Sequence, residues 1–136
     1  MSSILKKITN GRFPYFIAEI GVNHECSLKE AKKLINSAKE GGADAVKFQT
    51  YKAEKLAARK SPYYWDIKKE KTKSQFELFS KFDKFDLKDY KVLASYCKKK
   101  NIEFLSTPFD LDAVNFLSPL VKMFKISSSD ITNLPL

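Results

Sequence analysis

Four short apolar segments of this sequence each end in charged, amide or hydroxyl side chains. Because each segment is apolar over most of its length, we expect strands that are buried on both faces, as in a parallel sheet. In parallel α/β folds, the carboxyl ends of the strands meet at the face where active sites are built. The predicted strands are 15–20, 43–49, 102–106 and 123–126.

Capped amphipathic helices separate these predicted strands. Ser27 begins a capping box, and the apolar stripe of the helix that follows stops at the glycine pair 41–42. Asp86 and Asp110 are suited to cap two later helices. A strand, a capped helix and a second strand make a βαβ unit, whose crossover we expect to be right-handed.

Residues 50–85 interrupt this alternation. Ser74 is suited to cap a short helix that runs to about Phe79, but no sustained period covers the rest of the segment. A long insertion after the carboxyl end of a strand is typical of a lid or a substrate loop. The alternative is a surface excursion whose aromatic side chains pack on its own helix, and both interpretations stay open.

Four strand–helix units make half of an eightfold barrel, which takes about 250 residues when complete. No Gly-x-Gly-x-x-Gly follows the first predicted strand, so a dinucleotide-binding sheet lacks its main signature. We therefore predict an α/β fold, the N-terminal half of a TIM (β/α)8 barrel over residues 15–136. Residues 1–14 are expected to form an N-terminal arm.

Composition argues against several classes of protein. The 136 residues are 43% hydrophobic, enough for a core, but no run approaches the roughly 18 apolar residues of a membrane span. Cys26 and Cys97 lie far apart without metal-like spacing, so we expect a reducing, cytoplasmic location. Much of the net charge of +9 lies in lysine-rich stretches at 68–73 and 98–100, and no nucleic-acid-binding motif accompanies them. We therefore expect solvated lysine faces, and neither nucleic acid nor a membrane as a partner.

The polar strand ends predict a binding site for an anion. Two lysines, Lys47 and Lys125, together with hydroxyl groups suit a ligand with several anionic oxygens, such as a phosphate or a carboxylate. A buried carboxylate beside them, Glu19, could move a proton; alternatively, it simply pairs with one of the lysines. The other candidates at these strand ends are Asn23, Gln49, Thr107, Ser127, Ser128 and Ser129.

Four motifs, in this order, resemble those of sialic acid synthases. They are Phe-Ile-Ala-Glu-Ile-Gly-Val-Asn-His at 16–24, Gly-Ala-Asp-Ala-Val-Lys-Phe-Gln at 42–49, Ser-Thr-Pro-Phe-Asp at 106–110 and Phe-Lys-Ile-Ser-Ser at 124–128. That family makes N-acetylneuraminate and related nonulosonic acids. The resemblance covers nearly the whole chain.

The resemblance implies a phosphoenolpyruvate-dependent transferase. Family members condense phosphoenolpyruvate with an N-acylated aminohexose, typically N-acetylmannosamine, and release phosphate. A divalent metal ion, Mn2+ or Mg2+, polarises the aldehyde, and we expect its ligands to lie outside this segment. The resemblance also implies a homodimer at full length, with the rest of the barrel and a C-terminal antifreeze-like domain beyond this segment. We therefore expect the isolated segment to be inactive.

The matching motifs also suggest roles for single residues. Glu19 matches the catalytic carboxylate proposed to handle a proton of the water or the aldehyde. The positions that match phosphoenolpyruvate-binding residues are Lys47, Thr107, Lys125 and Ser128. Further candidates for substrate binding are Gln49, Asp130, Asn23 and His24, of which Asp130 matches an acidic residue near the sugar and His24 is expected to orient a loop or the substrate.

Departures from the family pattern leave the acceptor sugar open. Glu25-Cys26 follows where the family often has Asn-Gly or Asp-Gly, and Ser129 stands where it commonly has glycine. An alternative is therefore a related synthase for legionaminate, pseudaminate or a spore-coat sugar. A non-catalytic module that binds through its basic surface is the alternative from a different class.

Overall fold

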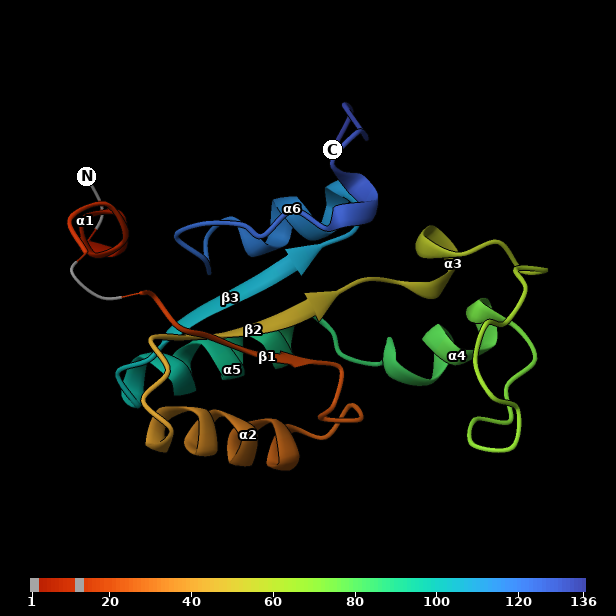
Figure 1. Ribbon diagram of the computed structural model, residues 1–136, viewed down its shortest axis with the longest axis horizontal. Coiled ribbons are helices and arrows are strands. Elements are labelled where there is room, and N and C mark those ends of the chain that lie inside the picture. Colours follow the sequence, from red (N-terminus) through yellow and green to blue (C-terminus); the bar gives the residue numbers. More distant parts are fainter. Residues whose placement is uncertain (1–2, 12–13) are drawn as a thin grey trace.

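The computed structural model of the protein describes residues 3–11 and 14–136, and these residues include one three-stranded sheet. The strands are β1 (Ile17–Gly21), β2 (Ala45–Thr50) and β3 (Glu103–Pro108). All pairs are parallel, and the spatial order is β1-β2-β3. β2 is therefore the central strand, and Figure 1 shows all three arrows pointing the same way.

Helices alternate with the strands as the sequence predicts. Their bounds are α1 (Ser3–Thr9), α2 (Leu28–Glu40), α3 (Ala53–Leu56), α4 (Gln75–Phe82), α5 (Leu87–Lys99) and α6 (Leu111–Leu117), followed by a 3-10 turn, Ser128–Asp130. In Figure 1, α3 and α4 lie beyond the arrowheads of the strands, and α1 lies at the opposite end. Within the described ranges, no helix has the length and apolar character needed to cross a membrane.

The predicted helix caps are present. The Ser27 hydroxyl accepts from the backbone N–H of Glu30 over 3.3 Å. Asp86 forms a full capping box, because its carboxylate accepts from the backbone of Asp89 while the Asp89 carboxylate accepts from the backbone of Asp86. The remaining predicted caps, Ser74 and Asp110, bind the first turns of α4 and α6. Side-chain acceptors thus satisfy N–H groups that have no partner within the helix.

One hydrophobic core lies between the sheet and the helices. Val46 and Phe48 of β2 face it and are fully buried. The fully buried helix residues of the same core include Ile35 of α2, Leu93 of α5 and Leu117 of α6. Because successive side chains of a strand point to opposite faces, Lys47 and Gln49 lie on the other face of the sheet.

The predicted fourth strand is not formed. Residues 123–126 have no strand pairing in the described part of the chain, and Lys125 and Ile126 are exposed. The segment is instead held by side chains, since Phe124 packs against the hydrophobic core. A strand requires a backbone partner along its edge, which the apolar character of 123–126 cannot supply by itself.

The first strand is less buried than predicted. Phe16 is 61% exposed and Ile17 is 44% exposed, because β1 is an edge strand whose one partner among the described residues is β2. Within the predicted arm over 1–14, Ser3–Thr9 is helical; residues 1–2 and 12–13 lie outside the described residues. Lys7 of this helix forms an ion pair with Asp44, just before β2.

Truncating Leu93 should destabilise the fold strongly. Leu93→Ala removes a fully buried side chain from the junction of α5 with the sheet, which we expect to lower the free energy of unfolding by about 3 kcal/mol. Val92→Ala is the matched control, since Val92 is the preceding residue of the same helix but is exposed. Urea denaturation measures both variants. Equal losses would show that α5 does not pack as described.

Candidate functional site

The Lys47 side chain is the centre of the candidate site. It lies on the face of β2 opposite the core and is only 8% exposed. Its ammonium group forms an ion pair with Glu19 of β1 and donates a hydrogen bond to the Thr107 hydroxyl of β3 over 3.3 Å. The register aligns Glu19 with Lys47 directly and places Thr107 two residues beyond the β3 position opposite Lys47. Three predicted site residues from three strands therefore meet.

A bulge at the end of β1 sets the position of the Glu19 carboxylate. The register of β1 against β2 shifts between Glu19 and Gly21, and Gly21 has a φ of +55°, in the region that favours glycine. A Cβ atom at Gly21 would lie 3.2 Å from Glu19 Oε1 and 3.9 Å from the side-chain carbonyl of Gln49. The Glu19 and Gln49 side chains thus both lie against Gly21, so Gln49 joins the site.

This arrangement can bind an anion and move a proton. The Lys47 ammonium and the Thr107 hydroxyl are hydrogen-bonding groups suited to anionic oxygens, and the Gln49 amide adds two donors. The Glu19 side chain is 50% exposed although its partner is buried, so an entering ligand can reach the carboxylate. A carboxylate within reach of a bound ligand can act as a general base.

Four predicted site residues are not joined to this cluster: Asn23, Lys125, Ser128 and Asp130. No hydrogen bond or ion pair within 3–11 and 14–136 links any of them to Glu19, Lys47 or Thr107. Three of them are exposed, and Asp130 is half-buried beside Ser129. Their proposed roles toward the substrate stay predictions.

His24 lies in the core rather than in the candidate site. It is 1% exposed and stacks on Phe85 with ring centroids 4.4 Å apart, and it also contacts Phe48, which faces the core. Its Nδ1 accepts from the backbone N–H of Cys26 over 3.0 Å, so the imidazole holds the loop after β1. This contact supports the predicted loop-orienting role, and substrate binding by His24 stays a prediction.

Burial lowers the pKa of His24 from 6.5 to about 4, since a charged imidazolium would lose its water. The nearby Gly21 backbone opposes this lowering in part, although Nε2 forms no hydrogen bond of ordinary geometry within the described residues. His24 is therefore neutral at pH 7.

Sequence reasoning missed a group of buried hydroxyls behind the site. The Thr50 and Ser106 hydroxyls hydrogen-bond each other over 2.7 Å, and the Tyr90 hydroxyl donates to the Gln49 carbonyl over 2.9 Å. Thr50 follows Val46 and Phe48 on the face of β2 that points to the core. A hydroxyl at such a core-facing position was the signal available in the sequence.

The insertion between β2 and α5 packs largely on itself. Trp65 Nε1 donates to the carbonyl of Thr72 over 3.2 Å, and the Tyr64 ring meets Trp65 edge-on at 5.3 Å. The guanidinium of Arg59 lies 5.3 Å from the ring of Phe76 in α4. These contacts support the surface excursion whose aromatic side chains pack within the insertion, although Tyr64 is still 77% exposed.

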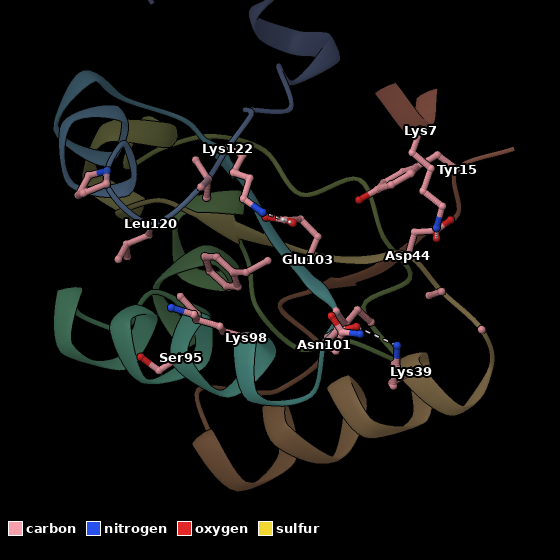
Figure 2. Close-up of a pocket in the computed structure, with 17 residues that line it drawn as sticks. Lys7, Tyr15, Lys39, Asp44, Ser95, Lys98, Asn101, Glu103, Leu120 and Lys122 are labelled. Atoms are coloured by element: carbon pink, nitrogen blue, oxygen red, sulfur yellow. Dashed lines mark hydrogen bonds and ion pairs between the residues drawn. The ribbon is translucent and has the colours of Figure 1, made fainter. Parts of the chain in front are cut away.

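A cavity of about 770 Å³ lies at the other end of the strands (Figure 2). Two ion pairs join different elements around it, as Lys122 binds Glu103 over 2.9 Å and Lys7 binds Asp44. Burial, with smaller contributions from Glu103 and Asp44, raises the pKa of Tyr15 to about 12. In barrels this end of the strands contributes to stability rather than chemistry, so we place the candidate site at Lys47 and not in this cavity.

Comparisons with known proteins identify the family of the chain. The sequence profile of the NeuB family matches residues 34–136. An N,N'-diacetyllegionaminic acid synthase of Campylobacter jejuni is 49% identical over 123 residues, which are 88% of this chain and 36% of that protein. The human N-acetylneuraminate-9-phosphate synthase is 38% identical over 130 residues, which are 92% of this chain and 35% of that protein.

A solved structure shows the same fold. The N-acetylneuraminic acid synthetase of Leptospira borgpetersenii, in complex with citrate, superimposes with a TM-score of 0.74 at 33% identity, covering 89% of this chain and 38% of that one. The parallel strands and outer helices described above are therefore part of the fold of such synthases. The chain spans only 35–36% of the length of the two named relatives.

Replacing Gly21 should displace the Glu19 carboxylate. In Gly21→Ala the new methyl group would lie too close to Glu19 Oε1, in addition to a backbone strain of about 1–2 kcal/mol from the positive φ. Gly42→Ala is the matched control, because Gly42 also has a positive φ, +82°, but a Cβ there meets nothing within 4 Å. Both variants should lose stability, and only Gly21→Ala should change the carboxyl 13C shift of Glu19. An unchanged Glu19 shift would contradict the described contact.

His24 should make the protein less stable in mild acid. The pKa of His24 is about 4 in the folded protein and 6.5 in the unfolded chain. Its contribution to the free energy of unfolding is therefore complete above pH 6.5 and is lost as the pH falls toward 4. At 1.36 kcal/mol per unit, the loss approaches about 3 kcal/mol at pH 4. Urea denaturation between pH 7 and pH 4 should show this component in the natural protein and not in His24→Asn. The same pH dependence in both would rule it out.

Proposed function

The chain belongs to the NeuB family, and from this premise we propose that it carries the phosphoenolpyruvate-binding part of a nonulosonic acid synthase. The proposed reaction condenses phosphoenolpyruvate with an N-acylated aminohexose and releases phosphate. The observation that supports it most is the buried Lys47 ammonium, which Glu19 and Thr107 flank on the site face of the sheet. A buried cation next to a movable carboxylate suits an anionic substrate that reacts with water.

In the proposed reaction each described side chain has a task. Lys47 binds an anionic oxygen of phosphoenolpyruvate, and the Thr107 hydroxyl hydrogen-bonds a neighbouring oxygen. An entering anion competes with Glu19 for the ammonium, and the half-exposed Glu19 side chain moves aside. The proposed role of Gln49, whose side chain lies beside Gly21, is to donate from its amide to the same ligand.

The proposed bond changes balance without any oxidant. Carbon 3 of phosphoenolpyruvate forms a bond to the aldehyde carbon of the open-chain sugar, whose oxygen takes up a proton. Water adds to carbon 2 and loses one proton. The bond between carbon 2 and the phosphate oxygen then breaks, and the new hydroxyl on carbon 2 gives its proton to the departing phosphate and becomes the keto group. Glu19 is the described group that can accept the proton of the attacking water or pass one to the aldehyde oxygen.

The expected metal ion is not assigned to these residues. Within the described ranges, no three His, Cys, Asp or Glu side chains are grouped so that they could hold a metal ion. The single histidine stacks in the core on Phe85. Mn2+ or Mg2+ bound by residues outside this segment stays a prediction, as does the homodimer.

A diacetylated acceptor is the second candidate for the sugar. Two relatives, of Campylobacter jejuni and Legionella pneumophila, are named N,N'-diacetyllegionaminic acid synthases and are 49% and 40% identical to this chain. The human N-acetylneuraminate-9-phosphate synthase is 38% identical. We therefore propose to assay N-acetylmannosamine against the six-carbon sugar with two acetamido groups that would yield diacetyllegionaminate. The preferred acceptor is the one with the higher kcat/KM.

Lys47→Ala should specifically impair the use of phosphoenolpyruvate. Removing one partner of a buried charge pair costs ~2–5 kcal/mol. At 1.36 kcal/mol for each factor of ten, kcat/KM for phosphoenolpyruvate should fall by about 30-fold or more in the intact enzyme. Binding of the acceptor sugar should change much less. We expect the same loss for Lys125→Ala, whose role the described contacts do not yet support.

Two surface lysines provide the controls. Lys69→Ala and Lys99→Ala remove exposed cations outside the site and should leave both substrates nearly unaffected. If they impaired phosphoenolpyruvate use as much as Lys47→Ala, the anion pocket would be elsewhere. Loss of an anionic macromolecular ligand in these variants, without any turnover by the natural protein, would favour the basic binding module instead.

A further inference from the structure

The hydroxyl group of Tyr90 binds the backbone at the carboxyl end of β2. Tyr90 lies on α5, is 5% exposed, and donates to the carbonyl oxygen of Gln49 over 2.9 Å. Its ring packs against Phe85 and Phe116, with centroids 5.9 Å and 5.7 Å away. A phenylalanine would make the same ring contacts, so the packing alone does not explain the hydroxyl.

β1 cannot satisfy the Gln49 carbonyl. The pairing of β1 with β2 ends at Gly21 and Phe48. Along a strand, residues an even number apart point their backbone N–H and C=O groups to the same side. Ala45 has such a spacing from Gln49, and its N–H donates toward β1, to the carbonyl of Phe16 over 3.2 Å. The Gln49 carbonyl therefore also points to the β1 side of β2, but the pairing with β1 has ended before this residue. Tyr90 supplies the donor that a longer β1 would have supplied.

A second buried contact secures the same end of β2 to β3. The Thr50 and Ser106 hydroxyls lie 2.7 Å apart on the core face, and both residues are buried. On the site face, Gln49 and Thr107 are direct partners in the register. Burying hydroxyl groups is unfavourable unless they are hydrogen-bonded, so apolar side chains would suffice for a core that only had to be stable.

We propose that Tyr90 is a positioning residue for the site. Its hydroxyl fixes the Gln49 peptide, so that the Gln49 side chain stays beside Gly21 and the Lys47 ammonium stays within reach of Thr107. The catalytic consequence rests on the proposed function, whereas the local order of β2 does not.

Tyr90→Phe in the intact enzyme tests this inference, with Tyr96→Phe as the matched control. Tyr96 also lies on α5 and donates its hydroxyl to a side chain, Asn36 Oδ1 of α2, over 3.0 Å, so its hydrogen bond goes to a helix and not to the backbone of β2. Tyr90→Phe should raise KM for phosphoenolpyruvate about tenfold, equivalent to 1.36 kcal/mol, and leave KM for the acceptor unchanged. It should also speed amide hydrogen exchange at Thr50 and Thr107. Tyr96→Phe should do neither.

The outcomes separate this inference from the proposed function. Equal effects of the two substitutions, or a fall in kcat alone in proportion to the folded fraction, would overturn the positioning role. If the natural enzyme neither binds nor uses phosphoenolpyruvate, the proposed function fails. The positioning role of Tyr90 is then tested by amide hydrogen exchange alone. Faster exchange at Thr50 and Thr107 only in Tyr90→Phe then supports the inference, and equal exchange in both variants overturns it.

Discussion

Burial of the Lys47 ammonium is the constraint on which the sheet and the site both depend. Taking an ammonium ion out of water costs several kcal/mol, which is offset only by an opposite charge and by well-placed hydrogen bonds. Here the charge comes from Glu19 on one neighbouring strand and the hydroxyl from Thr107 on the other. A slip of one residue in either pairing would turn the partner to the opposite face. The register of the three strands is therefore coupled to the chemistry of the site.

The bulge at Gly21 has two consequences for this arrangement. It places the Glu19 carboxylate over a residue without a side chain, where any Cβ would displace it. It also ends the pairing of β1 before β2 ends, so the last residues of β2 lose a backbone partner on that side. The Tyr90 hydroxyl and the Thr50–Ser106 contact then hold this end of β2 from the core face. Core and site residues are thus parts of one structural unit.

Features that depend on near neighbours in the chain could be predicted from the sequence. Ser27 and Asp86 cap helices through contacts two or three residues away, and the alternation along β2 determines that Lys47 and Phe48 face opposite sides. For Glu19 the sequence left two roles open, proton transfer and pairing with a lysine. The pairing with Lys47 follows from the order of the strands, which the βαβ pattern predicts.

Features that depend on distant parts of the chain could not be predicted in this way. The segment 123–126 is apolar enough for a strand but has no backbone partner among the described residues, and Ile17 is exposed because β1 is an edge. His24 follows Asn23 in a polar motif, yet its environment is decided by Phe48 and Phe85. No local pattern encodes the stacking of His24 on a residue that lies in the insertion before α5.

The balance of charge shows what the described site needs in order to hold its proposed substrate. Phosphoenolpyruvate carries about three negative charges at pH 7, from a phosphate and a carboxylate. The site contributes one buried ammonium, and Glu19 cancels its charge while the two are paired. The positive charge of the described site is therefore smaller than the negative charge of phosphoenolpyruvate, so further cations are needed near the ligand. Lys125 is exposed, and pairing of segment 123–126 with β3 would bring it to the carboxyl ends of the strands, on the side of β3 away from β2. Formation of this fourth strand and binding of the anion should accordingly stabilise each other.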